Sequence, residues 1–349
     1  MQSPNQNTKA GSFAMYKLPG SPTCHSIRTE PEELPDTAAM DGRDGFILAP
    51  FAESAATPIL IFAGEEETFP PPTAGRQTRR PPDPGRTADA QARAAYGDAF
   101  RALHSMLERK ELNKVVLARS RTMPQDLRAE AEEIFYSACR ENENGYVAIA
   151  ATPKNGIWLS ITPELLTMRD GETMKTMALA GTMSPGECEK RGWSEKNKRE
   201  QGVVSNYIMS TLAPLAKNIQ TDGGLTLTTR GLAHLQTKFT FTPCDGIKTS
   251  DVVSALHPTP AVCGMPKDSA LRAILTTERC RREYYSGYSG PIRANGDASL
   301  YVTLRCAKIS EEGWTLYAGG GLMPESTEQD EWDETEAKME AVKAIITQK

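Results

Sequence analysis

Hydrophobic and polar positions follow two periods along the chain, one typical of helices and one typical of strands. Apolar residues spaced three or four apart predict helices at about 96–107, 127–138, 194–216, 266–278 and 327–346. Short apolar runs predict strands at 12–20, 45–51, 57–64, 113–120, 145–151, 156–161, 164–181 (a hairpin), 224–231, 233–241, 284–292, 300–309 and 314–321. Because hairpin-connected strands mix irregularly with helices, the pattern indicates an α+β fold and argues against a doubly wound parallel sheet.

A proline-rich segment separates the first strands from the rest of the chain. Six prolines fall among charged residues between Gly64 and Arg86. Proline lacks a backbone N–H and cannot propagate a helix or a sheet, so this segment is predicted to be an exposed loop. We expect residues 1–92, which hold the loop and the strands before it, to form one domain with residues 93–349.

Composition and charge narrow the class of protein. The 349 residues are 39% hydrophobic and 24% charged, which is ordinary for a soluble globular chain. The net charge of −5 gives no reason to expect nucleic acid or an acidic membrane as a partner. The first ten residues are polar and no stretch approaches 18 apolar residues, so neither a secretion signal nor a membrane span is expected.

Cysteine and histidine usage points to a reducing compartment. The seven cysteines are widely spread and include no C-x-x-C pair, and the four histidines are equally scattered. Disulfides are rare in the cytoplasm, so we expect reduced thiols and a cytoplasmic location. The scatter also leaves no zinc site of ordinary spacing.

Two predicted helices carry carboxylates beside their apolar faces. In the last helix, Glu331, Glu334 and Lys338 fall at i, i+3 and i+7, along the edge of the predicted buried face. In the helix from Ser194, Glu200 lies ahead of the apolar stripe, three residues after Asn197. Such oxygen ligands suit a hard cation such as Mg²⁺, although a solvated salt-bridge surface explains the same spacing.

Strand ends supply a second candidate group. Lys114 begins the strand "KVVL", and Glu164 follows the strand "IWLSITP". Such a pair can act as base and acid, although strand-end charges are usually solvated. Glycines in "LAGT" and "YAGGG" suggest close approach of the backbone to a ligand, but no Lys-Ser/Thr follows them as in a phosphate loop.

Taken in order, these segments resemble the chorismate-utilising enzymes. The similarity is loose from residue 13 to 51 and close from 114 to 338, through "KVVLAR", "TPELL", "LAGT", "SEKNKRE", "LHPTPAVCG", "YYSGYSGP", "LYVTLRCA", "YAGGG" and "EWDETEAK". The resemblance implies a single large chorismate-binding domain, with antiparallel sheets packed face to face and helices outside, in four layers. Residues 93–349 would form its catalytic region.

The resemblance also implies roles for individual residues. Lys114 matches the base that activates water, and Glu164 matches the general acid. Glu200 and Glu334 match direct ligands of a Mg²⁺ cofactor, and Glu331 matches an acid that acts through metal-bound water. The residues matched to substrate binding are Tyr285, Arg305 and Lys338, for the carboxylates, and the backbone of Gly181, Thr182, Gly319, Gly320 and Gly321.

Within this family, "LHPTPAVCG" resembles the segment of the isochorismate synthases, which add water to chorismate at C2 and expel the C4 hydroxyl. We group its His257 with the substrate-binding residues, although a structural role is equally supported. A salicylate synthase, an amine-forming synthase and a non-catalytic binding protein remain alternatives. We expect a monomer without a glutaminase subunit, acting in menaquinone rather than siderophore or salicylate formation.

Four positions depart from the family pattern. Asn197, which we place with the metal-binding group, stands where the family usually has an acid, and Gln201 stands where a histidine commonly follows the metal glutamate. Ser160 and Gly320 replace a glycine and an alanine. These departures concern the surroundings of the metal and the shape of the pocket.

Overall fold

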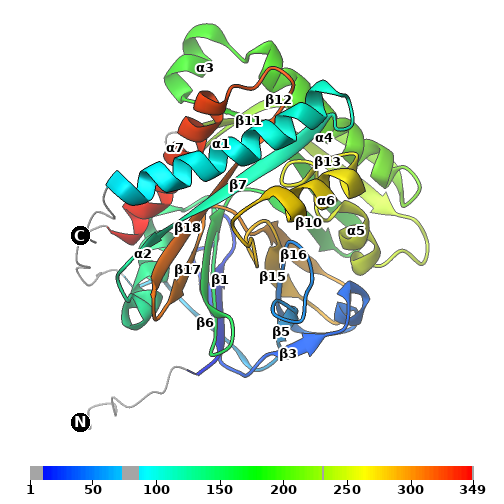
Figure 1. Ribbon diagram of the computed structural model, residues 1–349. Helices are drawn as coiled ribbons and strands as arrows, with labels where there is room; N and C mark the ends of the chain where they lie inside the picture. The colour runs from blue at the N-terminus through cyan, green and yellow to red at the C-terminus, as the bar shows by residue number, and fades with distance from the viewer. Residues whose placement is uncertain (1–10, 73–85, 230–231, 348–349) are drawn as a thin grey trace.

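The computed structural model describes residues 11–72, 86–229 and 232–347, and within them the strands form two nine-stranded antiparallel sheets (Figure 1). In spatial order, sheet A contains β14 (Gly264–Met265), β7 (Lys114–Met123), β18 (Gly313–Leu322), β17 (Cys306–Ser310), β9 (Gly156–Thr162), β8 (Tyr146–Thr152), β1 (Phe13–Lys17), β2 (Cys24–Ile27) and β6 (Glu66–Phe69). Sheet B contains β12 (Ala216–Thr229), β13 (Leu232–Pro243), β11 (Thr173–Met183), β10 (Leu165–Asp170), β16 (Ala298–Val302), β15 (Tyr288–Ile292), β4 (Gly45–Ala49), β5 (Ile59–Phe62) and β3 (Glu32–Leu34). The predicted α+β class is confirmed.

Helices cover the outer faces of the sheets. The α-helices of the described residues are α1 (Arg86–Glu108), α2 (Ala131–Glu141), α3 (Pro185–Arg191), α4 (Glu195–Leu212), α5 (Thr249–Leu256), α6 (Lys267–Thr277) and α7 (Glu328–Ile346). Helices α2 and α7 pack on sheet A, α4 and α5 pack on sheet B, and α1 and α6 pack beside β7 (Figure 1). No helix of the described residues is long and apolar enough to cross a membrane.

The sheets face each other across a shared apolar core. Phe46 and Leu48 of sheet B pack there with Tyr16, Tyr146 and Trp158 of sheet A. The layers are therefore helix, sheet, sheet and helix, as the resemblance implied. Both sheets take strands from the first 69 residues, since β1, β2 and β6 join sheet A and β3 to β5 join sheet B. Residues 73–85 of the predicted proline-rich loop lie outside the described residues.

The predicted helices are confirmed, with shifts at their ends. Helix α4 begins at the predicted cap, where the Ser194 hydroxyl accepts a hydrogen bond from the Asn197 N–H at 3.2 Å. It ends at Leu212, four residues before the predicted end, because Pro214 has no N–H to continue the helical hydrogen bonds. Helices α3 and α5 were not predicted.

Two predicted strands differ from the structure near the site. The segment 300–309 is two strands, β16 and β17, because the chain turns between them and Arg305 adopts a left-handed backbone with φ of 47°. The segment 284–292 is a strand only from Tyr288. Before it, Glu283 and Ser286 have φ of 50° and 64° and bracket Tyr284 and Tyr285 in a tight turn.

Candidate active site

A cavity opens between the two sheets near the first turns of α4 and α7. Its walls come from β7 and β18 of sheet A, from β11 and β13 of sheet B, and from the turns around 261–262, 285 and 304–305. The cavity is lined by ten of the residues proposed from the sequence: Glu164, Gly181, Thr182, Glu200, Tyr285, Arg305, Gly319, Gly321, Glu334 and Lys338. Four more proposed residues lie behind this lining, with Lys114 beside Glu200, Asn197 beside Gly181, and Glu331 beside Gly320.

Three glycines in β18 leave room for functional side chains. A Cβ at Gly321 would lie 2.2 Å from Glu200 Oε1, and one at Gly320 would lie 2.5 Å from Glu331 Oε2. A Cβ at Gly319 would lie 2.9 Å from the Tyr285 hydroxyl. Because successive residues of a strand face opposite sides, Gly319 and Gly321 open the cavity while Gly320 admits a carboxylate behind it.

Gly181 forms a β-bulge at the cavity edge of β11. Ala180 pairs with Leu235 and Thr182 pairs with His234, so Gly181 is the extra residue, with φ of 75°. Glycine adopts this backbone without strain, and a bulge redirects neighbouring groups. A Cβ here would lie 3.0 Å from the Asn197 Cβ, so the bulge also lets the start of α4 pack closely.

Lys114 and Glu200 form a buried ion pair next to the cavity. Lys114 is fully buried, and its Nζ lies 3.0 Å from Glu200 Oε1 without making a well-aligned hydrogen bond. The β14 and β18 strands flank Lys114, and Met265 is its register partner. The lysine therefore has an anionic neighbour.

Glu164 lies on the cavity wall at the corner between β9 and β10. Its N–H donates to the Thr162 hydroxyl at 3.1 Å, and its carbonyl accepts from the Val302 N–H at 3.0 Å, which fixes the corner. Burial raises the pKa of the Glu164 carboxyl to about 7, against the opposing charges of Lys114, Lys338 and Arg305. Near neutral pH, a substantial fraction of Glu164 is therefore a carboxylic acid.

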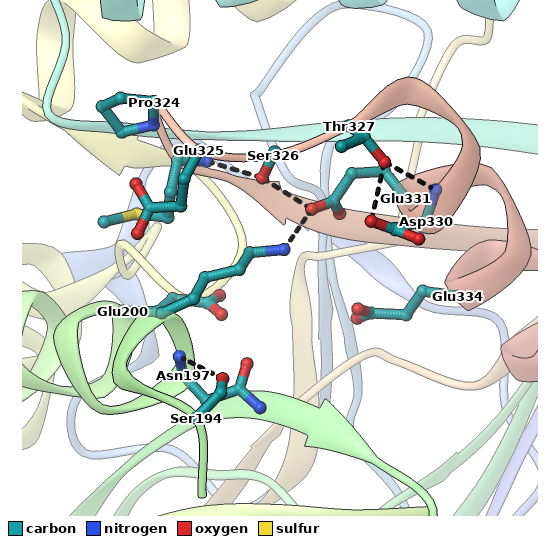
Figure 2. Close-up of polar contacts among 12 residues, drawn as sticks. Ser194, Asn197, Glu200, Pro324, Glu325, Ser326, Thr327, Asp330, Glu331 and Glu334 are labelled. Atoms are coloured by element: carbon teal, nitrogen blue, oxygen red, sulfur yellow. Dashed lines mark hydrogen bonds and ion pairs between the residues drawn. The ribbon is translucent and has the colours of Figure 1, made fainter.

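The first turns of α7 present two carboxylates toward α4. Figure 2 shows Glu200, Glu331 and Glu334 around a common space, with Ser326 beside Glu331. Glu331 is 1% exposed, and its Oε1 accepts from Ser326 at 2.7 Å and from Lys196 of α4 at 2.6 Å. Burial and the neighbouring Glu334 raise the pKa of Glu331 to about 7.

Glu334 instead stays ionised. Although burial favours its neutral form, Lys338 lies 2.6 Å from Glu334 Oε1 and lowers the pKa of Glu334, with help from Lys196 and the Thr182 hydroxyl. Lys338 also donates to the Gly319 carbonyl at 2.7 Å. Each carboxylate of the group is therefore held by a lysine.

The residues suit a magnesium ion by the chemistry of their donors. Three carboxylates from α4 and α7 face a common space, and the buried Oε2 of Glu331 has no hydrogen-bond partner. Mg²⁺ prefers such oxygen ligands. In the arrangement present, however, no three acidic, histidine or cysteine side chains of the described residues converge closely enough to chelate an ion. The carboxylates would have to exchange their lysine partners for the metal.

Sequence reasoning missed two residues of the site and misplaced one. His234, on β13, lines the cavity and contacts Arg305, and Lys196 contacts Glu331. His257 needs a correction, because it is not among the lining residues. Its Nε2 lies 3.1 Å from the Pro50 carbonyl oxygen and its ring packs edge-on against Tyr288, which is a structural role.

The departures from the family pattern have local explanations. Gln201 points at sheet B, where its Nε2 donates to the Ala178 carbonyl at 3.1 Å and to the Thr237 hydroxyl at 3.2 Å. The Ser160 hydroxyl donates to the Leu304 carbonyl at 3.1 Å, next to Arg305. Asn197 lies on α4 one turn before Glu200, and Figure 2 shows it on the same side of that helix.

Comparison with known proteins gives a consistent result. The sequence pattern of a family described as chorismate binding enzymes matches residues 66–347. The chain is 32% identical over 244 residues to isochorismate synthase DhbC of Bacillus subtilis, covering 65% of this chain and 61% of that protein. It is 29% identical over 259 residues to the vibriobactin-specific isochorismate synthase of Vibrio cholerae, covering 71% and 66%. The chain thus spans less than two thirds of the length of these relatives.

Solved structures share the architecture. The menaquinone-specific isochorismate synthase MenF of Escherichia coli aligns with a TM-score of 0.78 and 21% identity, over 97% of this chain and 89% of that one. Anthranilate synthase component I of Streptococcus pneumoniae aligns with a TM-score of 0.74 and 14% identity, over 98% and 95%. Two differently named activities share the fold, so the likeness concerns the fold alone.

Proposed function

Because the chain belongs to the family of chorismate-binding enzymes, we propose that it is an isochorismate synthase. The observation that carries the proposal is Glu164, a buried carboxyl with a pKa of about 7, on the wall of a cavity to which Lys114, Lys338 and Arg305 bring positive charge. A protein that only binds an anion has no need of a proton donor there. The isochorismate synthases among the relatives, at 29% and 32% identity, support the same reaction.

Substrate binding would rest on the cations and the tyrosine of the cavity. Chorismate carries two carboxylates, one on its ring and one on its enolpyruvyl group. Arg305, Lys338 and Tyr285 line the cavity and would hold them. A guanidinium offers two parallel N–H donors to a carboxylate, whereas lysine acts as a point charge. Stacking of Tyr285 on Tyr317, with ring centroids 5.5 Å apart, fixes the tyrosine ring.

Lys114 and Glu164 would move the two protons of the reaction. Lys114 would take a proton from water as a C–O bond forms at C2, and the double bonds shift as the C–O bond at C4 breaks. Glu164 would give its proton to the departing hydroxyl, so one water enters and one leaves. Lys114 must be neutral to accept this proton, and the Glu200 carboxylate, 3.0 Å away, favours its charged form. Binding of Glu200 to another cation would weaken that effect.

We further propose Mg²⁺ as the cofactor. When bound, it would supply positive charge that offsets the ring carboxylate and fixes the ring. Glu200 and Glu334 would be direct ligands, and Glu331 would act through water. Lys196 and Lys338, which now hold Glu331 and Glu334 at 2.6 Å, would have to release them.

One incubation tests the reaction. The purified chain, given chorismate and Mg²⁺ without ammonia or a second subunit, should produce isochorismate, identified by chromatography. A matched incubation with a chelator should stop the reaction. Salicylate or anthranilate as the product would contradict the proposed reaction, and unchanged chorismate would favour a binding protein.

The destination of the product is a separate proposal. We propose that the chain is a cytoplasmic monomer that supplies menaquinone formation. One relative is named for vibriobactin and one similar structure for menaquinone, and we choose menaquinone on the grounds of the family as a whole. Deleting the gene should deplete menaquinone, and loss of a siderophore instead would contradict the assignment.

A further inference from the structure

His234 connects the bulge of β11 to the arginine of the cavity. On β13 it pairs with Thr182 of β11, and the residue is 6% exposed. Its Nε2 lies 2.9 Å from Arg305 Nη2. Its Nδ1 lies 3.2 Å from the Gly181 carbonyl oxygen and 3.3 Å from the Thr182 hydroxyl. The ring therefore bridges two cavity segments that are far apart in sequence.

The partners of the ring determine its protonation. A guanidinium has donors only, so Nε2 of His234 must accept from Arg305. The proton of the neutral ring then lies on Nδ1, where it is donated to the Gly181 carbonyl. Burial, together with the charges of Arg305 and Lys338, lowers the pKa of His234 to about 3, which agrees with a neutral ring.

Arg305 has no carboxylate within ion-pair distance among the described residues, and His234 is its hydrogen-bond partner there. A neutral acceptor holds the guanidinium, and the backbone of Arg305 has a left-handed conformation with φ of 47°. An aspartate or glutamate in place of the histidine would neutralise the guanidinium. A neutral imidazole fixes one N–H and leaves the positive charge available to an anion in the cavity.

We propose that His234 is a positioning residue that acts through Arg305, holding the guanidinium so that its other N–H donors face a carboxylate of the substrate. The bulge at Gly181 is part of this arrangement, because it turns the carbonyl that anchors Nδ1 out of regular pairing with β13. This inference rests on the proposed function for the identity of the substrate, but the geometry requires only a ligand with a carboxylate.

A double-mutant cycle on chorismate binding tests the inference. His234→Leu removes the acceptor, and Arg305→Lys removes the fork that the acceptor orients. Measured by calorimetry, His234→Leu should weaken chorismate binding about tenfold, the worth of one hydrogen bond to a charged group. In the Arg305→Lys background the same change should have an effect of less than about twofold, because its target is gone. Equal effects in both backgrounds would overturn the proposal.

A conservative variant separates positioning from folding. His234→Gln retains an acceptor and should recover most of the affinity, whereas His234→Leu should not. In turnover, His234→Leu should raise KM and change kcat by less than about threefold. A large fall in kcat at unchanged KM would mean that His234 acts on the reacting atoms, and would overturn the proposal. If His234→Leu does not fold, His234→Phe, which keeps a ring of similar size but has no acceptor, carries the same cycle.

The binding cycle also separates this inference from the proposed reaction. Coupling between His234 and Arg305 in chorismate binding, without isochorismate as product, would contradict the reaction but uphold the positioning role. Isochorismate as the product, with additive effects of the two substitutions on binding, would uphold the reaction but contradict the positioning role.

Discussion

Glu164 and Glu331 are buried glutamates in two different regions of the site, and burial raises the pKa of each to about 7. The charges around Glu164 are the cations Lys114, Lys338 and Arg305, and the effect of burial outweighs theirs. Around Glu331, a second carboxylate adds to the effect of burial, and Lys196 opposes it. Protonation of Glu164 removes the charge that burial disfavours. A cation bound near Glu331 and Glu334 would instead reduce the repulsion between these two carboxylates.

Residue type alone therefore does not assign a role to a buried glutamate. A single buried carboxyl on a cavity wall suits a proton donor. A group of carboxylates that already holds lysine cations suits a metal ion. Substitutions that remove charge but keep shape should therefore have different consequences in the two regions, on chemistry in one and on metal affinity in the other.

The largest effect is expected at the cavity wall. Glu164→Gln keeps the shape of the side chain but has no acidic proton, and should lower kcat roughly 10²- to 10⁴-fold, the usual contribution of a positioned acid. The Mg²⁺ requirement should stay the same. Glu172→Gln, at an exposed turn, is the matched control. Near-normal turnover in Glu164→Gln would show that Glu164 is not the proton donor.

Lys114 should show a loss of similar size. Because Lys114 is fully buried and is the ion-pair partner of Glu200, we choose Lys114→Met, which retains most of the volume. Its kcat should fall roughly 10²- to 10⁴-fold at saturating chorismate. Lys110→Met, on the surface before β7, serves as the control. An unchanged kcat would assign Lys114 to structure alone.

Substitution in the carboxylate group should act on the metal. Glu334→Gln removes one direct ligand. It should raise the Mg²⁺ concentration for half-maximal activity at least about 10- to 100-fold, the range that loss of an outer-shell partner of a metal site commonly produces. Excess Mg²⁺ should restore much of the rate. Glu340→Gln, on the exposed side of α7, should leave the titration unchanged. An unaltered titration in Glu334→Gln would contradict the metal assignment.

The pH dependence should report Glu164. The proton donor is active only when protonated, so deprotonation of Glu164, with a pKa of about 7, should lower kcat/KM as pH rises, while the need for a neutral Lys114 should lower kcat/KM towards low pH. Because the folded pKa lies above the ordinary 4.5, the contribution of Glu164 to stability is fully present below pH 4.5 and is lost as pH rises through about 7. Glu164→Gln should lack that loss when its unfolding free energy is compared with wild type. Identical pH profiles of stability would contradict the raised pKa.

The smallest effect is expected at the departure in α4. Asn197→Asp would add a charge one turn from Glu200. At roughly 5 Å and an effective dielectric of about 20 to 80, the attraction between unit charges is about 1 to 3 kcal/mol before desolvation. We expect the Mg²⁺ concentration for half-maximal activity to fall about threefold to tenfold. A titration that overlays wild type would mean that Asn197 serves only to pack against Gly181.

Sequence reasoning reached those parts of the site that local patterns encode. The i, i+3, i+7 stripe of Glu331, Glu334 and Lys338 fixes their common side of α7 before any tertiary contact is known. His234 was missed because its role depends on Gly181 and Arg305, which are 53 and 71 positions away, and on a bulge that strand periodicity does not announce. The split at Arg305 was missed for a related reason, since apolar runs do not reveal one left-handed residue.

Isotope labelling tests the central claim, that one proton is taken from water on one side of the substrate while Glu164 gives another to the departing hydroxyl. The purified chain would be incubated with chorismate and Mg²⁺ in water enriched in oxygen-18, and the product analysed by mass spectrometry. The account predicts isochorismate with a single solvent oxygen, at the C2 hydroxyl, formed far more slowly by Glu164→Gln. Isochorismate without solvent oxygen would mean that the hydroxyl migrates within the substrate, and would contradict the account.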